Sequence, residues 1–436
     1  MQPNRRNLVI LFFTMIVIML GFGMVIPILP FYVESFGAGG SALGMLMASY
    51  GIMQFIFAPY WGGLSDRFGR KPILLIGVLG NALAQFLMGF STQLWMLFAA
   101  RALAGVLSSA TLPTAMAYIG DSTSDKERSG GMGMIGAAMG IGMVLGPGLG
   151  GWLGGSSLGF PFILAGCLSS LAFLLVLLLL PESLVEKAAP GRIAGPQLGV
   201  LRAALLGPLG VLFVLAFLLT FGLTNFEGVF GLYAARKYQY RPVDVGAILT
   251  VIGVISAMIQ GALVGPLSRR WGEANIIRFS FFGSAIGFVL MVLAGTDWQV
   301  WLTVCTFIAS NAMLNPAVAS MISKRAAQGQ GVALGLNNSF MSLGRIIGPL
   351  WAGFAFDLGI HLPYLSGALV MLLGFIIASL RLRYPAPIQS EARASEGAGE
   401  PALTAAINPP PTTSTPPRAS VQVNGSPRNN TPNKEP

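Results

Sequence analysis

A series of twelve long apolar runs constrains the fold more than any other feature of this sequence. A bilayer with a hydrocarbon core about 30 Å thick is crossed by about 20 apolar residues in a helix. Lipid leaves no partner for the open edge of a sheet, so runs of this length are not strands. The sequence therefore predicts an all-α membrane protein with twelve transmembrane helices. The runs cover about residues 8–32, 42–64, 72–90, 96–119, 131–153, 160–181, 207–233, 245–265, 275–295, 299–321, 331–354 and 362–381.

The composition excludes a soluble protein. Hydrophobic residues make up 54% of the chain and charged residues 10%, whereas a soluble domain has about 25% charged residues. The net charge of +10 could indicate nucleic-acid binding, but the basic residues are spread between apolar runs and form no stripe. We therefore expect the lipid bilayer, and no nucleic acid, to be a partner of this chain.

Neither a disulfide nor a metal site is expected. Cys167 and Cys305 lie inside apolar runs and lack metal-ligand spacing. The first apolar run is about 25 residues long and ends in Pro-Ile-Leu-Pro (residues 27–30) instead of a small-residue cleavage site. We therefore expect it to remain in the membrane as an anchor.

The distribution of Lys and Arg predicts the orientation of the chain. With the N-terminus in the cytoplasm, 21 of the 26 basic residues fall in cytoplasmic segments. Only Arg236, Lys237 and Arg241 fall in outer loops. Because cytoplasmic loops carry an excess of Lys and Arg, we expect both termini to be cytoplasmic.

The two parts of the chain repeat each other. Residues 62–69 recur as residues 265–272 with five identities in eight, and Pro113 recurs as Pro316 at the same offset of 203. The fifth and eleventh runs share four glycines and a proline at an offset of 202. This pattern predicts two pseudo-symmetric six-helix halves of like orientation, which is a transporter architecture with its substrate site between the halves.

The repeat also predicts where the parts of the chain begin and end. We expect a first half over residues 1–181, a cytoplasmic linker over 182–206 and a second half over 207–383. Residues 384–436 are rich in Pro, Ser, Thr, Ala and Asn, which is typical of a disordered segment. This cytoplasmic tail is either regulatory or a solvated extension without a role in transport.

The sequence gives little support for enzymatic chemistry. It contains no phosphate-binding loop, one histidine and no cluster of acids within a run. Residues 146–151 satisfy G-x-G-x-x-G, but they lie in a membrane-length helix and not between a strand and a helix. We expect a protein that is not an enzyme, needs no cofactor and takes its energy from an ion or substrate gradient.

The loop after the second run, G-G-L-S-D-R-F-G-R-K over residues 62–71, is a candidate cytoplasmic gate. We expect Asp66 at the beginning of the third helix, where the helix dipole favours a carboxylate. Asp66, Arg70 and Asp121 can form a charge cluster that locks the cytoplasmic ends in one state. The alternative is a plain basic loop that only sets topology. The candidate gate residues are Gly62, Asp66, Arg67, Gly69, Arg70, Lys71 and Asp121.

This loop resembles the signature of the major facilitator superfamily. Leu20-Gly21 with residues 27–30, and Arg101 with Gly105, resemble motifs of its twelve-helix drug:proton antiporters, although Ala104 replaces the usual glutamine. The fifth run matches the antiporter motif in full, with Gly142, Gly146, Pro147, Gly150 and Gly151. The resemblance covers residues 1–383. Its glycines allow close helix packing and its proline allows a bend.

Shorter strings are similar to bacterial efflux pumps of two kinds. Residues 53–59 resemble tetracycline pumps. Phe226-Glu227, residues 271–273 and residues 316–318 resemble multidrug pumps. The resemblance implies export of lipophilic drugs in exchange for protons, through a monomer.

Glu227 is the candidate proton-coupling residue, because it is the one carboxylate well inside a predicted span. An ionisable group within the membrane is a functional hypothesis by default, and multidrug pumps have an acid at the matching position. The alternative is a solvated acid near the outer interface. The sequence departs from those pumps at Ala312 and Asn315, where they have an acid and an arginine. It has Arg345 instead, which we expect to pair with Glu227.

Arg101 should face the cavity or pair with carbonyl groups, because an unpaired arginine in lipid is costly. We expect it to act in proton transfer or gating, or else as a structural anchor. Residues expected to line the substrate cavity are polar, aromatic or Met side chains on shared helix faces, each of which can equally face lipid or the core. These candidates are Tyr50, Gln54, Thr224, Phe230, Asn311, Asn338 and Met341.

Together these features predict a bacterial inner-membrane transporter that exports lipophilic drugs in exchange for protons. The alternatives are a tetracycline-selective pump and a proton-linked carrier that takes up or exports a metabolite, because a fold does not define a function. A membrane receptor that has lost transport is a further alternative, in keeping with the missing second acid.

Overall fold

The computed structural model describes residues 3–184, 198–326 and 329–382, and all regular structure in these ranges is helical. Eleven membrane-length apolar spans lie in this part of the chain. The twelfth is α15, Gln330–Leu358, which has 29 residues but carries Asn337, Asn338 and Arg345, so its hydropathy is lower. The twelve predicted spans correspond to these twelve helical segments.

Nine of the twelve spans are single helices. The first half has α1 (Pro3–Ser35), α2 (Gly40–Phe68), α3 (Arg70–Gly89), α6 (Asp125–Gly154) and α7 (Phe160–Leu179). The second half has α9 (Gly210–Tyr238), α12 (Glu273–Leu293), α15 and α16 (Leu362–Arg381). A short helix, α8 (Leu198–Leu206), lies in the predicted linker, and the predicted tail lies outside the described residues.

The other three spans are interrupted. The fourth consists of α4 (Leu94–Leu107), a 3-10 turn and α5 (Thr111–Ser122), and the tenth of α13 (Asp297–Asn311) and α14 (Leu314–Arg325). The eighth consists of α10 (Pro242–Met258), a π-helical turn and α11 (Val264–Trp271). Pro113 and Pro316 lie just after the interruptions of the fourth and tenth spans. Because proline has no N–H to give to the preceding turn, it accounts for both breaks.

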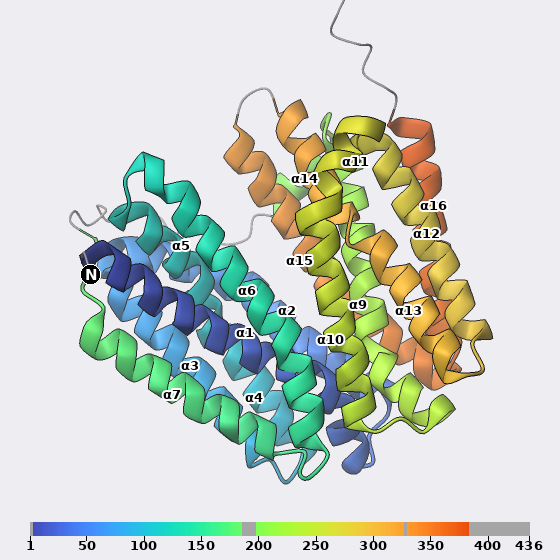
Figure 1. Cartoon of the computed structure of the whole chain (residues 1–436), viewed down its shortest axis with the longest axis horizontal. Coiled ribbons are helices and arrows are strands. Elements are labelled where there is room, and N and C mark those ends of the chain that lie inside the picture. The colour runs from blue at the N-terminus through green and yellow to red at the C-terminus, as the bar shows by residue number, and fades with distance from the viewer. Residues whose placement is uncertain (1–2, 185–197, 327–328, 383–436) are drawn as a thin grey trace, which may run out of the picture. The chain divides into compact units, whose positions relative to one another are not determined.

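The two halves meet at one end of the bundle, which we call the closed end; it carries the loops at residues 36–39, 155–159, 239–241 and 359–361. Figure 1 shows α2 and α15, and α6 and α10, running together across the halves. A Cβ atom on Gly44 would lie 2.3 Å from the carbonyl oxygen of Pro349, and one on Gly151 would lie 2.4 Å from that of Pro242. These backbone contacts are possible only because the glycines have no side chain.

Polar contacts add to this closure. The Asp357 carboxylate on α15 accepts hydrogen bonds from the backbone N–H groups of Gly40 (2.7 Å) and Ser41 (2.8 Å) and from the Ser41 hydroxyl. An acid of one half therefore caps the N-terminus of α2 in the other half. Arg236 on α9 and Glu34 on α1 form a second link, with 3.6 Å between Nε and Oε1.

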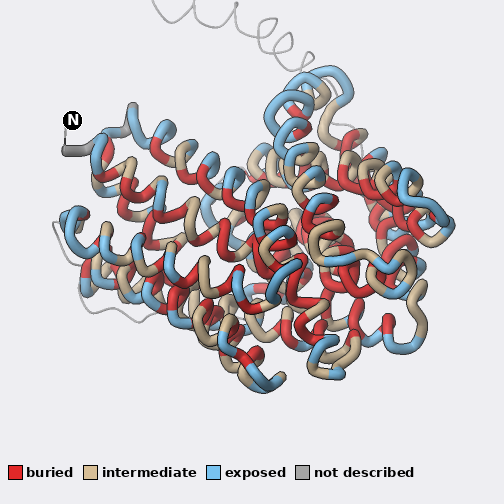
Figure 2. The backbone as a smooth tube through the Cα atoms, turned by 60° about the horizontal axis from the view of Figure 1, so that its bottom comes forward, coloured by how far each residue is buried: buried red, intermediate tan, exposed pale blue. Residues whose placement is uncertain are grey.

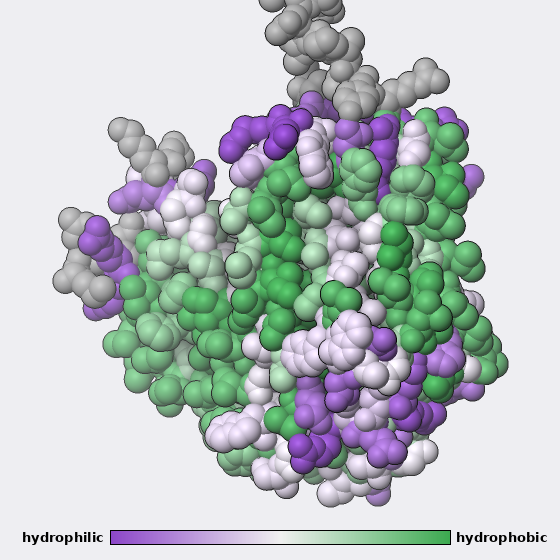
Figure 3. Space-filling model, turned by 45° about the vertical axis from the view of Figure 1, so that its right-hand side comes forward, coloured by the Kyte–Doolittle hydropathy of each residue, from purple (hydrophilic) through white to green (hydrophobic). Residues whose placement is uncertain are grey.

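Burial follows the helix faces that point into the bundle (Figure 2). On the face shown in Figure 3, hydrophobic side chains form a band and hydrophilic ones gather above and below it. This is the surface expected of a protein that crosses a bilayer.

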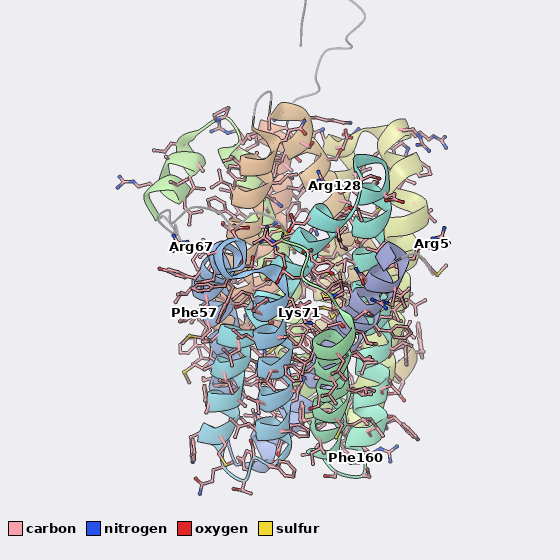
Figure 4. All side chains as sticks on the ribbon, turned by 90° about the vertical axis from the view of Figure 1, so that its left-hand side faces the viewer. Arg5, Phe57, Arg67, Lys71, Arg128 and Phe160 are labelled. Atoms are coloured by element: carbon pink, nitrogen blue, oxygen red, sulfur yellow. The ribbon has the colours of Figure 1, made fainter. Side chains whose placement is uncertain are left out.

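Most labelled basic residues of the first half lie toward one end of the bundle. In Figure 4, Arg5, Arg67 and Arg128 lie on the upper side, Lys71 lies near mid-height at the level of Phe57, and Phe160 lies at the opposite end. We call this basic end the gate end. Its cytoplasmic orientation stays a prediction from the Lys and Arg counts.

Candidate functional site

A cavity of about 580 Å³ lies among the helices of the first half, the linker helix α8 and α15 of the second half. This volume is in the range of small-molecule sites. Three of the seven predicted cavity residues, Tyr50, Gln54 and Asn338, line it, together with Arg101 and Arg345. We call it the arginine cavity.

Arg101 on α4 is only 5% exposed and lies over the ring of Tyr50, with 4.7 Å from the guanidinium carbon to the ring centroid. Gln54 lies one turn further along α2 and donates a hydrogen bond to the Tyr50 hydroxyl at 3.3 Å. Among the residues that the structure describes, the Arg101 Nε has no hydrogen-bond partner. Of its two predicted placements, Arg101 takes the one that faces the cavity.

Glu227 lies on a different cavity, of about 940 Å³, which we call the acid cavity. Its lining comes mainly from α6 and α10, with Leu223 and Glu227 from α9. Most of these residues are apolar, and Gln260 of the π-helical turn is a polar exception. A carboxylate in such a lining has few groups to stabilise its charge, so it is suited to bind a proton.

Glu227 and Arg345 are close enough to attract each other electrostatically. Their charged atoms do not come within the 4.0 Å of an ion pair in the described structure. Arg345 also acts on Tyr50, which lies beside Arg101. Arg345 therefore interacts electrostatically with a residue of the acid cavity, Glu227, and with a residue of the arginine cavity, Tyr50. The direct ion pair expected between Arg345 and Glu227 stays a prediction.

The other four predicted cavity residues do not line either cavity in the described structure. Phe230 is 1% exposed and stacks on Phe226, with ring centroids 4.8 Å apart. The Thr224 hydroxyl donates to the Thr220 carbonyl at 2.8 Å, within the contact between α9 and α15. Asn311 and Met341 are 5% and 8% exposed.

Three of the five charged residues of the candidate gate, Asp66, Arg70 and Asp121, form one cluster. Arg70 NH1 lies 2.5 Å from the Asp66 carboxylate, and Arg70 Nε lies 2.8 Å from that of Asp121. Arg70 also donates to the Ser65 hydroxyl at 2.7 Å. All four residues belong to the first half, so the cluster braces the ends of α2, α3 and α5 against one another.

The expected position of Asp66 is wrong. Asp66 lies in the last turn of α2, and α3 begins at Arg70 after Gly69. Gly69 has φ +113°, a conformation that a side chain would strain, and so it ends one helix and starts the next. Arg67 and Lys71 are partly exposed around this turn, and Gly62 has open space where a side chain would lie.

The N-terminus of α3 is capped by Glu182, a residue that the sequence analysis did not identify. Its carboxylate accepts hydrogen bonds from the backbone N–H groups of Arg70 (2.8 Å) and Lys71 (3.1 Å). The Tyr118 hydroxyl donates to the neighbouring Pro181 carbonyl at 2.9 Å. The chain just after α7 is thereby tied to the gate cluster.

We expect Glu182→Ala to lower the stability of the protein by about 1 kcal/mol, because α3 loses its cap and the charge that complements its dipole. Glu182→Gln should lose less, since its amide oxygen still accepts one bond. Thermal unfolding of the purified protein in detergent, followed by tryptophan fluorescence, checks this order. Equal melting temperatures for all three proteins would show that the cap contributes nothing.

The second half repeats the gate cluster with its charges exchanged. Glu273 on α12 pairs with Lys324 on α14. These residues correspond to Arg70 and Asp121 at the offset of 203. Gly272, which corresponds to Gly69, also has a positive φ of +74°. Each half therefore braces its own gate end with an ion pair at corresponding positions, Arg70 with Asp121 and Glu273 with Lys324, and the first half adds the pair of Arg70 with Asp66.

The glycines of the predicted antiporter helix lie against α1. Cβ atoms on Gly142, Gly146 and Gly150 would each lie 2.5–2.8 Å from atoms of that helix. Gly151 faces α10 instead, and Pro147 lies beside Gly23 of α1 and Gly246 of α10. The α6 helix therefore packs its own half with one glycine face and the opposite half with another.

Known proteins are similar to this chain over most of its length. The chain matches the family model of the Major Facilitator Superfamily over residues 11–349 and 212–417. Multidrug resistance protein 2 of Bacillus subtilis is 32% identical over 378 residues, which are 86% of this chain and 94% of that protein. Quinolone resistance protein NorA of Staphylococcus aureus is 30% identical over 389 residues, which are 89% and 99% of the two chains.

Solved structures share the fold at lower identity. A bacterial homologue of the human lysosomal transporter Spinster, in an inward-facing and unoccupied conformation, has a TM-score of 0.70 at 14% identity and covers 87% of this chain and 95% of that one. The nucleoside transporter NupG has a TM-score of 0.70 at 16% identity, with 88% and 100% of the chains covered.

Proposed function

The chain belongs to the Major Facilitator Superfamily, and from this premise we propose that it exports lipophilic drugs or related small molecules in exchange for protons. The observation that carries this proposal is its similarity, over 94% and 99% of their lengths, to proteins named for multidrug and quinolone resistance. A transporter with their fold, and with a cavity of drug-like size, is suited to the same work.

Glu227 supports the exchange for protons. It faces a mostly apolar cavity and is near a cation, Arg345, that favours its charged form. A group held between these opposing influences can gain and lose a proton as its surroundings change. In the proposed cycle, Glu227 takes a proton in the state in which the two halves have separated at the closed end. It releases the proton at the gate end when drug binds.

The change between these states moves the halves past each other. Separation of the closed end has to part the glycine contacts and the Asp357 cap of α2. Closure of the gate end has to bring together the two braced clusters, that of Arg70 and that of Glu273. We assign the protein to the bacterial inner membrane as a monomer with both termini cytoplasmic, without a cofactor beyond the proton gradient.

One observation favours a second candidate function, proton-linked movement of a metabolite in the same direction as the proton. Protonation of Glu227 removes the charge that attracts Arg345. If Arg345 also holds an anionic substrate, proton and substrate bind together instead of in turn. This coupling would give symport, and the direction of substrate movement separates the two functions.

The test uses everted membrane vesicles from an efflux-deficient bacterial strain that expresses the chain. Respiration acidifies their lumen, which corresponds to the cell exterior. An exporter that exchanges drug for protons should concentrate a fluorescent lipophilic cation or tetracycline in the lumen, and a protonophore should abolish this accumulation.

Depletion of a substrate from the lumen, instead of its accumulation, would establish symport. Accumulation of tetracycline alone would establish a selective pump. No difference from vesicles without the protein, for any of these compounds, would contradict drug export.

A further inference from the structure

The arginine cavity has an unbalanced charge. Arg101 from the first half and Arg345 from the second half both line it, and no carboxylate is among its described lining residues. Glu227, the acid that attracts Arg345, lines the other cavity. Two positive charges in a site of low dielectric repel a cation and attract an anion.

Arg101 has hydrogen-bonding capacity that a ligand could use. The residue is 95% buried, and in the described part of the chain it has no counter-ion and its Nε has no hydrogen-bond partner, which is costly for a charge. Tyr50 covers one face of the guanidinium, so the group keeps its planar edge for other contacts. An arginine edge fits a carboxylate through two parallel hydrogen bonds.

Further donors lie on the same cavity. Thr111 is 99% buried, and its hydroxyl has no hydrogen-bond partner within the described ranges. The Tyr50 hydroxyl accepts a bond from Gln54, which leaves its own O–H to donate. A buried polar group without a partner costs about 1–3 kcal/mol, so a ligand that bonds to Arg101 and Thr111 would recover part of this cost.

Apolar side chains supply the rest of the lining. Phe22, Phe55 and Met19 line the cavity, and the linker helix adds Val200 and Leu201. Aromatic and Met side chains offer adaptable apolar walls. A ligand that fits has an aromatic or apolar body and one oxyanion.

We propose that this cavity binds aromatic carboxylates, with the carboxylate held by Arg101 and Arg345 and the body against Phe22 and Phe55. The proposal rests on the proposed transport function and names one substrate class of that transporter, the class that binds in this cavity; a lipophilic cation exported by the same protein would have to bind elsewhere. It also excludes a simple organic cation as the ligand of this cavity.

Three naphthalene probes of similar size test the proposal: 2-naphthoate, its methyl ester and 2-naphthyltrimethylammonium. Their binding to the purified full chain in lipid nanodiscs is measured by calorimetry. Wild type should bind naphthoate about tenfold or more tightly than the ester, as expected for hydrogen bonds to a charged group. It should bind the cation most weakly.

Variants assign the preference to the cavity. Arg345→Gln should weaken naphthoate binding roughly tenfold and leave the ester unchanged, and Arg345→Lys should fall between it and wild type. Thr111→Val, which changes the volume little, should weaken naphthoate alone and serves if Arg345→Gln does not fold. Arg241→Gln is the matched control, because Arg241 lies in a loop and its side chain is 77% exposed.

Two results would overturn the proposal: binding of the ester or the cation as tight as that of naphthoate, or a preference for naphthoate that survives Arg345→Gln. Failure of the proposed function looks different. If the vesicles export drugs but the purified chain does not prefer the carboxylate, only the site is wrong. If naphthoate binds as expected and no drug is exported, the site stands and drug export is wrong.

Discussion

Glu227→Gln should abolish proton-driven export and leave a folded protein that still binds its substrate. Glutamine keeps the size and hydrogen-bonding groups of glutamic acid but cannot gain or lose a proton. In the proposed cycle the variant corresponds to a permanently protonated Glu227, so the protonation step that couples drug to proton is missing. Drug accumulation in everted vesicles should fall to the level of vesicles without the protein.

A second measurement separates loss of coupling from loss of the carrier. Exchange of labelled drug against unlabelled drug, without a pH gradient, requires the movement of the halves but no net proton transfer. This exchange should persist in Glu227→Gln. Glu34→Gln is the matched control, because it makes the same change in an acid that is 42% exposed and pairs with Arg236 at the closed end. An exposed pair of this kind contributes about 0–1 kcal/mol, so the control should transport normally.

Accumulation against a gradient by Glu227→Gln at the wild-type rate would show that another group carries the proton. The described structure offers no second acid on the acid cavity. Arg101 and Arg345 keep their protons at physiological pH, so their glutamine variants would next show whether these fixed charges are needed for coupling.

The helices could be predicted from the sequence because the bilayer thickness imposes a minimum length on each spanning helix, a constraint that does not act on soluble proteins. Their ends could not. The second predicted span ended at residue 64, whereas α2 continues to Phe68, since its last turn is polar and lies beyond the apolar run. The same error placed Asp66 at the start of α3 instead of the end of α2.

Contacts between distant segments explain why Glu182 was missed. It caps α3 although 112 residues separate it from Arg70. Its one signal in the sequence is its place after the sixth apolar run, which brings it to the same end of the bundle as the gate loop. Alternation of the spans predicts that shared end, but which loops touch there depends on the packing of the helices.

Cavity-facing residues were the hardest to predict, because α9 is buried on nearly all sides and its apolar residues follow no single face. The sequence pattern around Phe230 was therefore as consistent with a cavity position as with a core position. In the structure Phe230 packs in the core. On α2 and α15, polar residues at helical spacing marked one face, and Tyr50, Gln54 and Asn338 lie on a cavity. Periodic polarity within an apolar helix is thus the more informative signal.

The repeat explains why the closed end has two similar crossings. Gly44 of α2 packs against Gly353 of α15, and Gly246 of α10 packs against Gly151 of α6. Both Gly44 and Gly246, and both Gly151 and Gly353, are related by the offset of 202. In each half, the second helix (α2 or α10) packs against the fifth helix of the opposite half (α15 or α6). Both crossings should therefore separate when the closed end opens.

We expect Gly353→Ala to disfavour the state in which α2 and α15 are in contact at the closed end. Transport should decrease as a result. The added Cβ would lie 2.1 Å from the Gly40 carbonyl oxygen and 3.1 Å from the Gly44 Cα, and these are backbone atoms that cannot rotate away. Overpacking of this kind costs about 1–3 kcal/mol, which corresponds to a shift of roughly 5- to 150-fold in the equilibrium between the two states.

Spin labels at residues 38 and 360, in a variant without Cys167 and Cys305, measure the separation of the halves at the closed end. The distance distribution of Gly353→Ala should move to longer values, and Gly151→Ala should act in the same direction at the other crossing. Gly335→Ala is the matched control on the same helix, because a Cβ there meets nothing within 4 Å. The opposite outcome is an unchanged distance distribution and normal transport in Gly353→Ala. It would show that α2 and α15 can accept a methyl group while the closed end stays shut. The glycine crossings would then not control the movement of the halves.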